Sequence, residues 1–585
     1  MDSDNLRLGI IDMSLPVELF NSARRRLEDP PISDGDNDTC SDLSDDDCEP
    51  HIPSSSDEEC SDSASDTECD NLNRVDDTVE KFVLGRDKIT KWYAESPRPE
   101  KDLQPNIVHE EAGVHSDFPT RSEYAAFNFF ITDEIIAITL KATNQRGSVV
   151  HGANWKNVNA VELMGWLGLH IRCGVDRDNF RHIDELFSAK TGPPIYQATM
   201  SRARFLQIKK CIRFDDMNTR MERKSGEQGW LAPIHDVFER FVEACQVNYK
   251  ASAYVTIDEL LLPFRGKCPF KVYMPQKTDK YGIKVWSMAD ATNAYLLNAQ
   301  IYREKVGQAE TNPQRVVHDL IATIENTGRN VTTGNLFTDF SLAKSLLDKN
   351  LTLLGTLRRN KPEIPSSFKR SKGRKIYSTE FGFSKEERVM ICSYVPKKGK
   401  AVLMLSSMHF NKDVQEKDPF KPHVILDYDA TKGGVDQLDV LVKNYTCKRI
   451  SNRWPLVVFY WMVDIAGYNS FVSFTEKNPT AYEGPRQRRK FLTVLAERLC
   501  LPQIKQYSQS YGRFMPCHVK MCVKAFLNRE DRPSVTQSEG EEKKRKCGFC
   551  SMNINKKKKK SCTNCDKPIC AEHSYSVCTE CLPYL

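Results

Sequence analysis

Hydrophobic and polar positions follow different rhythms along the chain, and the first clear rhythm is helical. Between residues 118 and 253, apolar residues recur three or four positions apart, which is the spacing of an amphipathic helix. The runs with this spacing are 124–131, 161–171, 205–212 and 234–247. We therefore expect this part of the chain to be a helical region.

From residue 254 the pattern changes to short runs of β-branched and aromatic residues, which favour strands. We expect strands at 254–258, 271–274, 283–288 and 294–302, then a helix at 314–324, a strand at 330–336, a helix at 342–347 and a strand at 351–357. Strands followed by alternating helices and strands predict a mixed α/β sheet flanked by helices.

Residues 361–422 have the pattern of a separate β-rich insertion, with strands at 389–395 and 401–407 joined by Lys-Lys-Gly-Lys. The run Val424-Ile-Leu-Asp427 is interpreted as the strand at which the sheet resumes. A helix is expected to follow from about Val435.

After Pro455 the chain is expected to be helical to about residue 527. Its most apolar run, 454–474, contains Asp464 and Asn469, so it predicts a core helix. No stretch reaches the ~18 uninterrupted apolar residues that a membrane span needs. Residues 1–20 lack the basic start and small-residue cleavage site of a secretory signal. We expect an intracellular protein with no membrane partner.

Charge is divided unevenly along the chain. Residues 28–80 contain 20 acidic residues and one basic residue, Arg74, for a net charge of −19. Since the whole chain of 585 residues carries +5, the remainder carries +24. Such an acidic segment cannot bury enough apolar surface to fold, so we expect disorder, with its serines either phosphorylated or simply part of a solvated tail. A basic body predicts a polyanionic partner, most simply nucleic acid.

Seven of the 20 cysteines lie between Cys547 and Cys581, in Cys-x-x-Cys and Cys-x-x-His pairs. With one histidine they make eight ligands, the number that two tetrahedral zinc ions need. Interleaved pairs close so short a segment on itself, so the first and third pairs are predicted to hold one Zn²⁺, and the second and fourth pairs the other. The first set is Cys547, Cys550, Cys570 and His573; the second is Cys562, Cys565, Cys578 and Cys581. Clustered thiols of this kind indicate a reducing compartment.

Lysines beside these ligands indicate the partner of the zinc module. Nine lysines and arginines lie within 543–560, including Lys556, Lys557, Lys558, Lys559 and Lys560. Adjacent cations repel each other unless phosphates neutralise them, so we interpret the run as a DNA contact that is also compatible with a nuclear import signal. Ubiquitin-transfer and chromatin-reading modules use similar interleaved pairs, so a ubiquitin ligase is a further class of function. We expect a nuclear location.

Three aspartates stand in positions typical of catalysis. Asp258 ends the predicted strand 254–258, which would place it at the carboxyl edge of the sheet. Asp436 and Asp439 lie three residues apart on one helical face, where a divalent cation would relieve their repulsion. Each aspartate taken alone is equally well explained as a helix cap or a surface charge.

Distinctive sequence blocks surround these aspartates in a fixed order. The first holds Thr256-Ile-Asp-Glu, Phe264-Arg-Gly-Lys-Cys-Pro-Phe-Lys and Lys280-Tyr-Gly-Ile-Lys; the second holds Asn335-Leu-Phe-Thr, Leu342-Ala-Lys and Gly355-Thr-Leu-Arg-Arg-Asn-Lys; the third holds Asp427-Tyr-Asp, Thr431-Lys-Gly-Gly-Val-Asp-Gln-Leu-Asp and Asn452-Arg-Trp-Pro. These blocks resemble the three catalytic blocks of piggyBac-type DNA transposases, and the cysteine module is similar to that of the family. The resemblance is colinear from about residue 118 to 585, and the chain is identified as a member of this family.

The resemblance implies an RNase H-like α/β core of the DDD-transposase type, split by the insertion and framed by a helical dimerisation and DNA-binding region. It implies a homodimer acting on double-stranded DNA, which cuts element ends, forms hairpins on TTAA overhangs and joins the 3′-hydroxyls to a new TTAA. Three aspartates would hold two Mg²⁺ ions for phosphoryl transfer.

The resemblance also assigns individual residues. Asp258 falls on the first catalytic position, Asp436 on the third and Asp439 on an additional aspartate. Arg358 and Lys361 fall on basic residues that contact DNA near the active site, and Lys432 in the third block is assigned to DNA contact with them.

The second catalytic aspartate is missing from this chain. Where the family has Asp-Asn-aromatic-Phe-Thr-Ser, the chain reads Gly334-Asn-Leu-Phe-Thr-Asp339. Gly334 has no side chain with which to hold a metal, and triads that act as a unit lose several orders of magnitude when one member goes. Asp339 is either a substitute ligand or, in our preferred interpretation, the N-terminal cap of the next helix. The chain is accordingly read as a cleavage-deficient DNA-binding relative, with an active transposase of rearranged site as the alternative.

The expected order of domains follows from these observations. It is an acidic tail (1–85), an N-terminal linker (86–117), a helical region (118–253), the first part of the core (254–360), the insertion (361–422), the second part of the core (423–446), the second helical part (447–530), a charged linker (531–545) and the zinc module (546–585).

Overall fold

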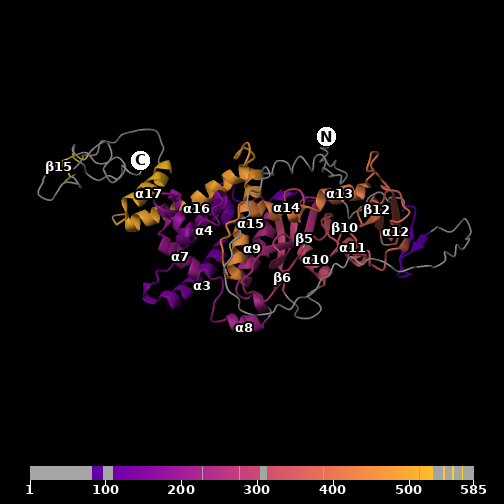
Figure 1. Ribbon diagram of the computed structural model, residues 1–585, viewed down its shortest axis with the longest axis horizontal. Helices are drawn as coiled ribbons and strands as arrows, with labels where there is room; N and C mark the ends of the chain where they lie inside the picture. The colour runs from indigo at the N-terminus through magenta and orange to yellow at the C-terminus, as the bar shows by residue number, and fades with distance from the viewer. Residues whose placement is uncertain are drawn as a thin grey trace, which may run out of the picture.

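A computed structural model describes most of the chain between residues 82 and 530. The described residues are 82–96, 108, 110–226, 228–275, 277–303, 312–386, 388–512 and 514–530, with 545–546, 557–558, 570 and 573. Helices gather at one end of an elongated molecule and the sheet extends toward the other end (Figure 1). The acidic segment 28–80 and most of the predicted zinc module lie outside the described residues.

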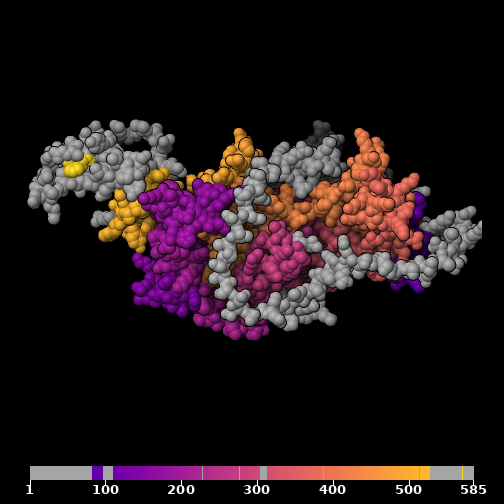
Figure 2. Space-filling model, in the orientation of Figure 1, coloured from indigo at the N-terminus to yellow at the C-terminus, as the bar shows by residue number. Residues whose placement is uncertain are grey.

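The helical end combines two segments that are far apart in the sequence. The first contributes α2 (Glu123–Asn128), α3 (Asp133–His151), α4 (Ala160–Asp176), α5 (Ile183–Leu186), α6 (Pro194–Thr199), α7 (Arg202–Cys211), α8 (Arg220–Ser225) and α9 (His235–Asn248). The second contributes α15 (Trp454–Lys477), α16 (Gln487–Tyr511) and α17 (Cys517–Glu530). α16 packs along α4, and α17 packs against α6, so the two segments form one body (Figures 1 and 2).

Short polar side chains start the first helices of this body. Ser122, Thr132, Asn159 and Ser201 each precede a helix and accept a hydrogen bond from a backbone N–H of its first turn. Such caps satisfy donors that the helix itself leaves unpaired. The helical prediction for residues 118–253 is confirmed by these elements.

By length and composition α15 could cross a membrane, but 94% of its most apolar stretch of 18 residues is buried inside the protein. Asn469, in the middle of this helix, has its side-chain amide bonded to both backbone groups of Leu296. The prediction of a core helix is therefore confirmed. This helix joins the helical body to the sheet.

The described residues form an 11-stranded mixed sheet in the order β1-β2-β11-β12-β13-β10-β9-β5-β7-β6, with β8 pairing β7. The strands are β1 (Phe82–Leu84), β2 (Lys91–Tyr93), β5 (Tyr254–Pro263), β6 (Lys271–Tyr273), β7 (Tyr281–Asp290), β8 (Leu296–Ile301), β9 (Asn330–Thr333), β10 (Thr352–Thr356), β11 (Thr379–Ser384), β12 (Val389–Lys397) and β13 (Lys400–Ser406). β9 runs parallel to both β5 and β10, whereas β7 pairs antiparallel with β5. Two short strands, β3 (Gly113–Val114) and β4 (Tyr249–Lys250), pair outside this sheet.

The remaining helices of this part lie against the sheet or its extension. α10 (Pro313–Ile321) packs on β7 and β8, and α11 (Phe340–Leu347) packs on β10 and β12. α12 (Ser366–Lys369) packs on β12 and β13. α13 (His423–Thr431) and α14 (Gly434–Asn444) both pack on β5. The sheet is thus flanked by helices, as the order of elements in the sequence predicts.

Two features of the insertion differ from the sequence-based expectation. The predicted hairpin is present as β12 and β13, but it is not separate, because β13 pairs antiparallel with β10 and continues the core sheet. β2 pairs with β11, and β1 pairs with β2 to form the outer edge of this extension. β1 lies at the end of the predicted acidic tail, and β2 lies in the predicted linker. Short apolar runs such as Phe82-Val-Leu84 carry little signal by themselves, and only the partner strand makes them part of a sheet.

The predicted strand at Val424-Ile-Leu-Asp427 is wrong, because these residues form part of α13. Pro422 precedes the helix, and Val424 and Ile425 bury their side chains where α13 packs on β10 and β13. A run of three apolar residues fits a buried helical turn as well as it fits a strand. The helix predicted from Val435 is confirmed as α14, which begins at Gly434.

Candidate carboxylate site

The parallel ladder between β5 and β9 places Asp258 beside Gly334. Its last pair is Ile257 with Thr333, so the next residue on each strand is Asp258 and Gly334. Asp258 does not end its strand as predicted, since β5 continues to Pro263; the strand that ends at this level is β9. The carboxylate therefore lies where a neighbouring parallel strand stops, which leaves room above the sheet edge.

A buried hydroxyl network holds the end of α13, three residues before α14 begins, against these strands. The Thr256 hydroxyl donates to the Thr431 carbonyl oxygen (2.6 Å), and the Thr332 hydroxyl donates to the Thr431 hydroxyl (2.8 Å). Because side chains alternate along a strand, Asp258 shares the face of Thr256 that looks toward α13 and α14. Side chains also alternate along β9. If this alternation continues to residue 334, position 334 lies on the same face as Thr332.

Gly434 brings α14 closer to β5 than any other residue would. A Cβ atom at this position would lie 2.7 Å from Thr256 Oγ1 and 3.2 Å from Ala291 Cα. Asp436 and Asp439 follow on the first two turns, while Val435, Leu438 and Leu441 are buried. The glycine thus determines how near the two aspartates of the helix come to Asp258.

Burial is the main influence on the charge of two of the carboxyl groups, those of Asp258 and Asp439. Burial raises the pKa of Asp258 to about 6; the backbone N–H of Glu259 opposes this, and the negative charge of Asp436 adds to it. Burial likewise raises the pKa of Asp439, against the attraction of Lys443. The negative charge of Asp436 therefore acts on the carboxyl groups of Asp258 and Asp439, as expected of a cluster that holds cations.

Two lysines bring positive charge to this cluster. Lys277 Nζ lies 3.3 Å from Asp436 Oδ1, and Lys443 Nζ lies 2.9 Å from Asp439 Oδ2. Burial lowers the pKa of Lys277, but the carboxylates of Asp436 and Asp258 outweigh it and hold that pKa above its usual range. Lys277 comes from the loop between β6 and β7.

The donor chemistry of the cluster suits a hard cation, whereas its number of ligands falls short. Carboxylate oxygens are the ligands that Mg²⁺ prefers, and Asp436 lies close enough to Asp258 for its charge to raise the pKa of Asp258. Within the described residues, however, there is no group of three or more His, Cys, Asp or Glu side chains spaced to hold an ion. A carboxylate at position 334 would add the missing ligand, and a Cβ built there meets nothing within 4 Å. The described residues therefore do not supply the full set of ligands that a two-ion site needs.

Asp339 is committed to a structural role. Its Oδ1 accepts hydrogen bonds from the Leu342 backbone N–H (2.8 Å) and the Ser341 hydroxyl (2.9 Å), which makes it the N-terminal cap of α11. Gln314 Nε2 and Lys361 Nζ also contact the carboxylate, at 2.7 Å and 3.4 Å from Oδ2. Burial raises its pKa, but these hydrogen bonds outweigh it and hold the pKa below the usual range. The prediction of a cap is confirmed.

The chain between Gly334 and Asp339 forms a hydrogen-bonded turn. The Gly334 carbonyl oxygen accepts from the backbone N–H groups of Phe337 and Thr338, both at 3.2 Å. The Thr338 hydroxyl also donates to this oxygen at 3.0 Å, and Phe337 is buried. Asp339 would have to break this turn and the cap to reach the position beside Asp258.

The basic residues assigned to DNA contact lie on the two segments that flank the cluster. Arg358 and Lys361 follow β10, and within the described part of the chain no acceptor reaches the buried Nε of Arg358. Lys361 pairs with Asp339. Lys432 lies between α13 and α14, where it pairs with Asp429 at 2.6 Å and is 49% exposed.

Little of the predicted zinc module falls within the described residues. Cys570 Sγ and His573 Nδ1 lie 3.2 Å apart, as two members of one predicted ligand pair would. Of the lysine run, Lys557 and Lys558 form β15, which pairs with β14 (Arg545–Lys546). The other predicted zinc ligands, and Lys556, Lys559 and Lys560, lie outside the described residues.

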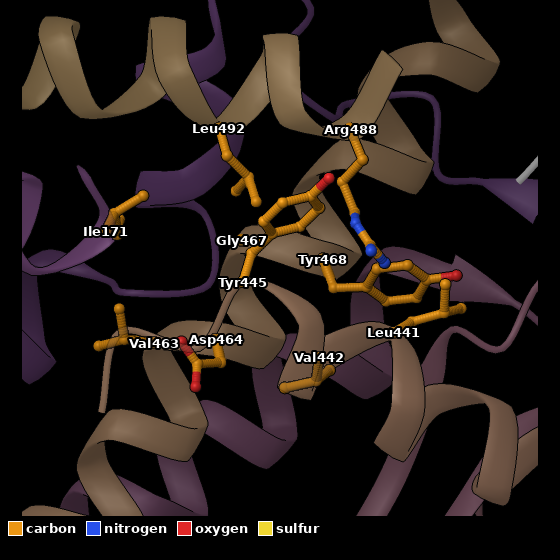
Figure 3. Close-up of a pocket in the computed structure, with 10 residues that line it drawn as sticks. All are labelled: Ile171, Leu441, Val442, Tyr445, Val463, Asp464, Gly467, Tyr468, Arg488 and Leu492. Carbon is orange, nitrogen blue, oxygen red and sulfur yellow. The ribbon is translucent and has the colours of Figure 1, made fainter. Parts of the chain in front are cut away.

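A small cavity of about 20 Å³ lies on the opposite side of α14 from the carboxylates, which is room for one water molecule. Its lining includes Leu441, Asp464 and Arg488, and the Arg488 guanidinium lies over the rings of Tyr445 and Tyr468 (Figure 3). Burial raises the pKa of Asp464 to about 7, although Thr446 and the Cys447 backbone N–H donate to it. The cavity is a packing feature of the helical body and does not connect Asp258 with its neighbours.

Three residues that shape the cluster escape sequence reasoning. Lys277 is one lysine among many, and nothing in its spacing indicates that it meets Asp436. Thr431 and Gly434 belong to the third sequence block, so their presence there was a signal, but their contacts with Thr256 appear only in the fold.

Comparisons with known proteins agree with this arrangement. A sequence model of the family described as Transposase IS4 matches residues 122–471. The cryo-EM structure of the piggyBac transposase synaptic complex with hairpin DNA is similar over 81% of this chain and 100% of that chain, with 31% sequence identity and a TM-score of 0.71. A match over more than half of the chain and a relative above 30% identity agree on the same family. The chain therefore belongs to the piggyBac-type transposase family.

Proposed function

We propose that this protein binds double-stranded DNA as a piggyBac-type transposase but does not cleave it, because Gly334 stands where the site needs a second aspartate. The observation that carries the proposal is the last pair of the β5–β9 ladder, Ile257 with Thr333, because Asp258 follows the one residue and Gly334 follows the other. Mg²⁺, when bound between Asp258 and the aspartates of α14, would activate the attacking oxygen and stabilise the leaving one. Without a carboxylate at position 334, the chain lacks the oxygens to place both ions.

The charges around the cluster support DNA as the ligand. Outside the acidic segment the chain carries +24, and the Arg358 Nε group lacks an acceptor within the described chain that a phosphate oxygen would provide. The ion pair of Lys432 with Asp429 is partly exposed, so it contributes about 0–1 kcal/mol and is easily exchanged for a contact with a phosphate. By its relation to a synaptic complex with hairpin DNA, we propose TTAA-flanked element ends as the DNA and a homodimer as the binding form.

The alternative, an active enzyme that uses Asp339, is disfavoured by the contacts of that residue. Its carboxylate holds the first turn of α11 and accepts from Gln314 and Ser341. Removing a cap typically lowers the free energy of unfolding by about 0.5–2 kcal/mol, and the turn at Gly334 would have to open as well. A rearranged site would therefore have to overcome several native contacts.

The test is a cleavage assay on TTAA-flanked ends with Mg²⁺, comparing the native protein with Gly334→Asp. We expect DNA binding by both, and nicking and hairpin formation by Gly334→Asp alone. Gly334→Asn is the matched control, since it has the same shape without the charge and should stay inactive. Adding Asp258→Asn to Gly334→Asp should abolish the restored cleavage.

Two results would contradict the proposal. Cleavage by the native protein that is lost in Asp339→Asn would establish the alternative, because asparagine preserves the cap but not the charge. Failure of Gly334→Asp to cut, although it binds the same ends, would mean that the defect lies elsewhere.

A further inference from the structure

The N-terminal hairpin of β1 and β2 holds the chain that follows β10. Four successive backbone carbonyl oxygens there, those of residues 360–363, accept hydrogen bonds from the hairpin. The bonds are Arg86 Nη2 to Asn360 O (2.8 Å) and Lys361 O (2.7 Å), Asp87 N to Pro362 O (3.0 Å), and Trp92 Nε1 to Glu363 O (2.8 Å). The hairpin therefore fixes the backbone of the loop 358–363, although the two lie about 270 positions apart in the sequence.

Close packing accompanies these hydrogen bonds. A Cβ atom at Gly85 would lie 2.7 Å from Glu363 O, so the absence of a side chain lets the hairpin approach the loop this closely. Trp92 is buried, and its ring meets that of Phe340, the first residue of α11, edge to face at 5.6 Å between centroids. The hairpin thus contacts both the loop and the start of the helix whose cap pairs with Lys361.

The turn that carries Arg86 is stabilised from within. The Asp87 carboxylate accepts hydrogen bonds from the backbone N–H groups of Ile89 and Thr90, both at 3.1 Å, and from the Thr90 hydroxyl at 2.6 Å. The Gly85 N–H also donates to the Thr90 carbonyl oxygen at 2.8 Å. Because the turn has its own hydrogen bonds, it can order the loop that it contacts.

The loop 358–363 carries three cations close together. Arg358 Nε is buried with no acceptor among the described residues, Arg359 is exposed, and Lys361 forms an ion pair of 3.4 Å. The backbone of a loop determines where its side chains begin. A loop whose backbone is fixed beforehand loses less conformational freedom when it meets a ligand, and this raises its affinity.

We propose that the hairpin is a clamp that holds the loop 358–363 in the conformation that contacts DNA, with Arg86 as its positioning residue. Arg86 acts through the carbonyl oxygens of the loop, while Arg358 and Lys361 meet the phosphates. The inference rests on the proposed function, because it takes these two residues to contact DNA, but it concerns the order of the loop and not cleavage.

The test measures binding of the full-length protein to a duplex of TTAA-flanked ends over a range of salt concentrations. Arg86→Met should bind about tenfold more weakly at low salt, and its slope of log affinity against log salt should be shallower by about 1–2, because up to two phosphate contacts are weakened. Hydrogen exchange of the DNA-free variant should be faster in residues 358–364 and unchanged elsewhere. The Arg86 side chain is exposed, so the variant should keep its fold.

Lys88→Met is the matched control, since it removes the same charge from an exposed residue of the same turn, and it should bind DNA like the native protein. A second comparison adds Arg86→Met to the double variant Arg358→Met and Lys361→Met. No further loss of affinity is expected there, because Arg86 acts through these two residues.

Three results would overturn the inference. One is equal affinity of Arg86→Met and the native protein. Another is an additive loss in the triple variant, which would mean that Arg86 contacts the phosphates itself. The third is faster exchange throughout the chain of Arg86→Met with a lower unfolding temperature, which would make Arg86 a general structural residue.

Failure of the inference and failure of the proposed function give different results. If the native protein and Lys88→Met bind the ends and Arg86→Met binds them as tightly, the proposed function stands and the clamp does not. If the native protein does not bind these ends, the proposed function fails and the inference fails with it. If Arg86→Met loses affinity as expected but Gly334→Asp does not cut, the inference stands and the explanation of the missing cleavage fails.

Discussion

Gly334 lies beside Asp258, one step beyond the last pair of the parallel ladder between β9 and β5. The position has open space around it and an ordinary backbone conformation, so nothing in the fold requires glycine there. The backbone around Gly334 thus has room for a side chain, and only the carboxylate is missing. An aspartate introduced at this position should therefore restore it.

The first prediction concerns the stability of variants at position 334. Gly334→Ala should raise the free energy of unfolding by about 0.4–1 kcal/mol, because it restricts the unfolded chain without a clash in the folded one. Gly334→Asp should lower the unfolding temperature in Mg²⁺-free buffer, since it adds a negative charge beside Asp258, and Mg²⁺ should restore it. Thermal unfolding with and without Mg²⁺ measures both effects, and an equal Mg²⁺ response of Gly334→Asn would contradict them.

The second prediction concerns the approach of α14 to β5. Gly434→Ala should lower the free energy of unfolding by about 1–3 kcal/mol, because its Cβ would meet Thr256 Oγ1 at 2.7 Å and backbone at Ala291. Gly334→Ala serves as the control for the same substitution in open space. Chemical denaturation measures the difference, and equal stability of the two alanine variants would show that the contact is relaxed in solution.

The third prediction is a pH dependence of stability that Asp258 causes. Its folded pKa of about 6 exceeds the ordinary value, so the folded state holds the proton more tightly than the unfolded state. Its destabilising effect is therefore absent below about pH 4 and complete above about pH 6 to 7. At pH 8, Asp258→Asn should have a free energy of unfolding up to about 2–3 kcal/mol higher than that of the native protein, and it should unfold at a higher temperature. Near pH 4 the two proteins should unfold at the same temperature.

The native protein is the internal control for this comparison, because other buried carboxyl groups such as Asp464 are present in both proteins and cancel in the difference. Asp258→Asn should also retain DNA binding. Marked unfolding of the variant at every pH would mean that Asp258 supports the fold rather than a charge-based function.

The fourth prediction concerns the zinc module. A chelator with little affinity for Mg²⁺ should release about two zinc ions per chain and abolish recognition of element ends, since metal binding supplies most of the folding free energy of so small a module. A zinc-sensitive dye counts the ions, and electrophoretic mobility measures DNA binding. Full binding by the metal-depleted protein would show that the module does not read DNA.

The fifth prediction concerns the acidic segment 28–80. If this segment competes with DNA for the basic body, deleting residues 1–80 should strengthen non-specific DNA binding about tenfold at low salt, and the gain should fade as salt rises. The deletion ends before Phe82 so that β1 is preserved. Replacing the acidic residues of 28–80 by their amides should have the same effect, and unchanged affinity of both variants would remove this role.

Much of the scaffold could be predicted because its signals are local. β5, β7, β9 and α14 each carry a run of the right period, and the aspartates sit within distinctive blocks. The cap at Asp339 was predictable for the same reason, since it needs only a short polar side chain before a helix.

What could not be predicted depends on partners that are distant in sequence. The pairing of β13 with β10 joins the insertion to the core, and the sequence of neither strand indicates which strand it pairs with. Lys277 and Asp436 are 159 positions apart in the sequence, so their contact depends on where the fold places the loop that carries Lys277. The helix at Val424 was mistaken for a strand because three apolar residues in a row cannot distinguish the two by period.

The hairpin of β1 and β2 has a consequence for how the chain folds during synthesis. Trp92 is only 2% exposed, its indole N–H donates to the Glu363 carbonyl oxygen, and β2 pairs with β11 through Tyr93 and Phe383. The first described segment to leave the ribosome must therefore wait for partners beyond residue 360. At about 5–20 residues per second this delay is about 15–60 s, during which the Trp92 side chain, buried in the finished fold, is available to chaperones.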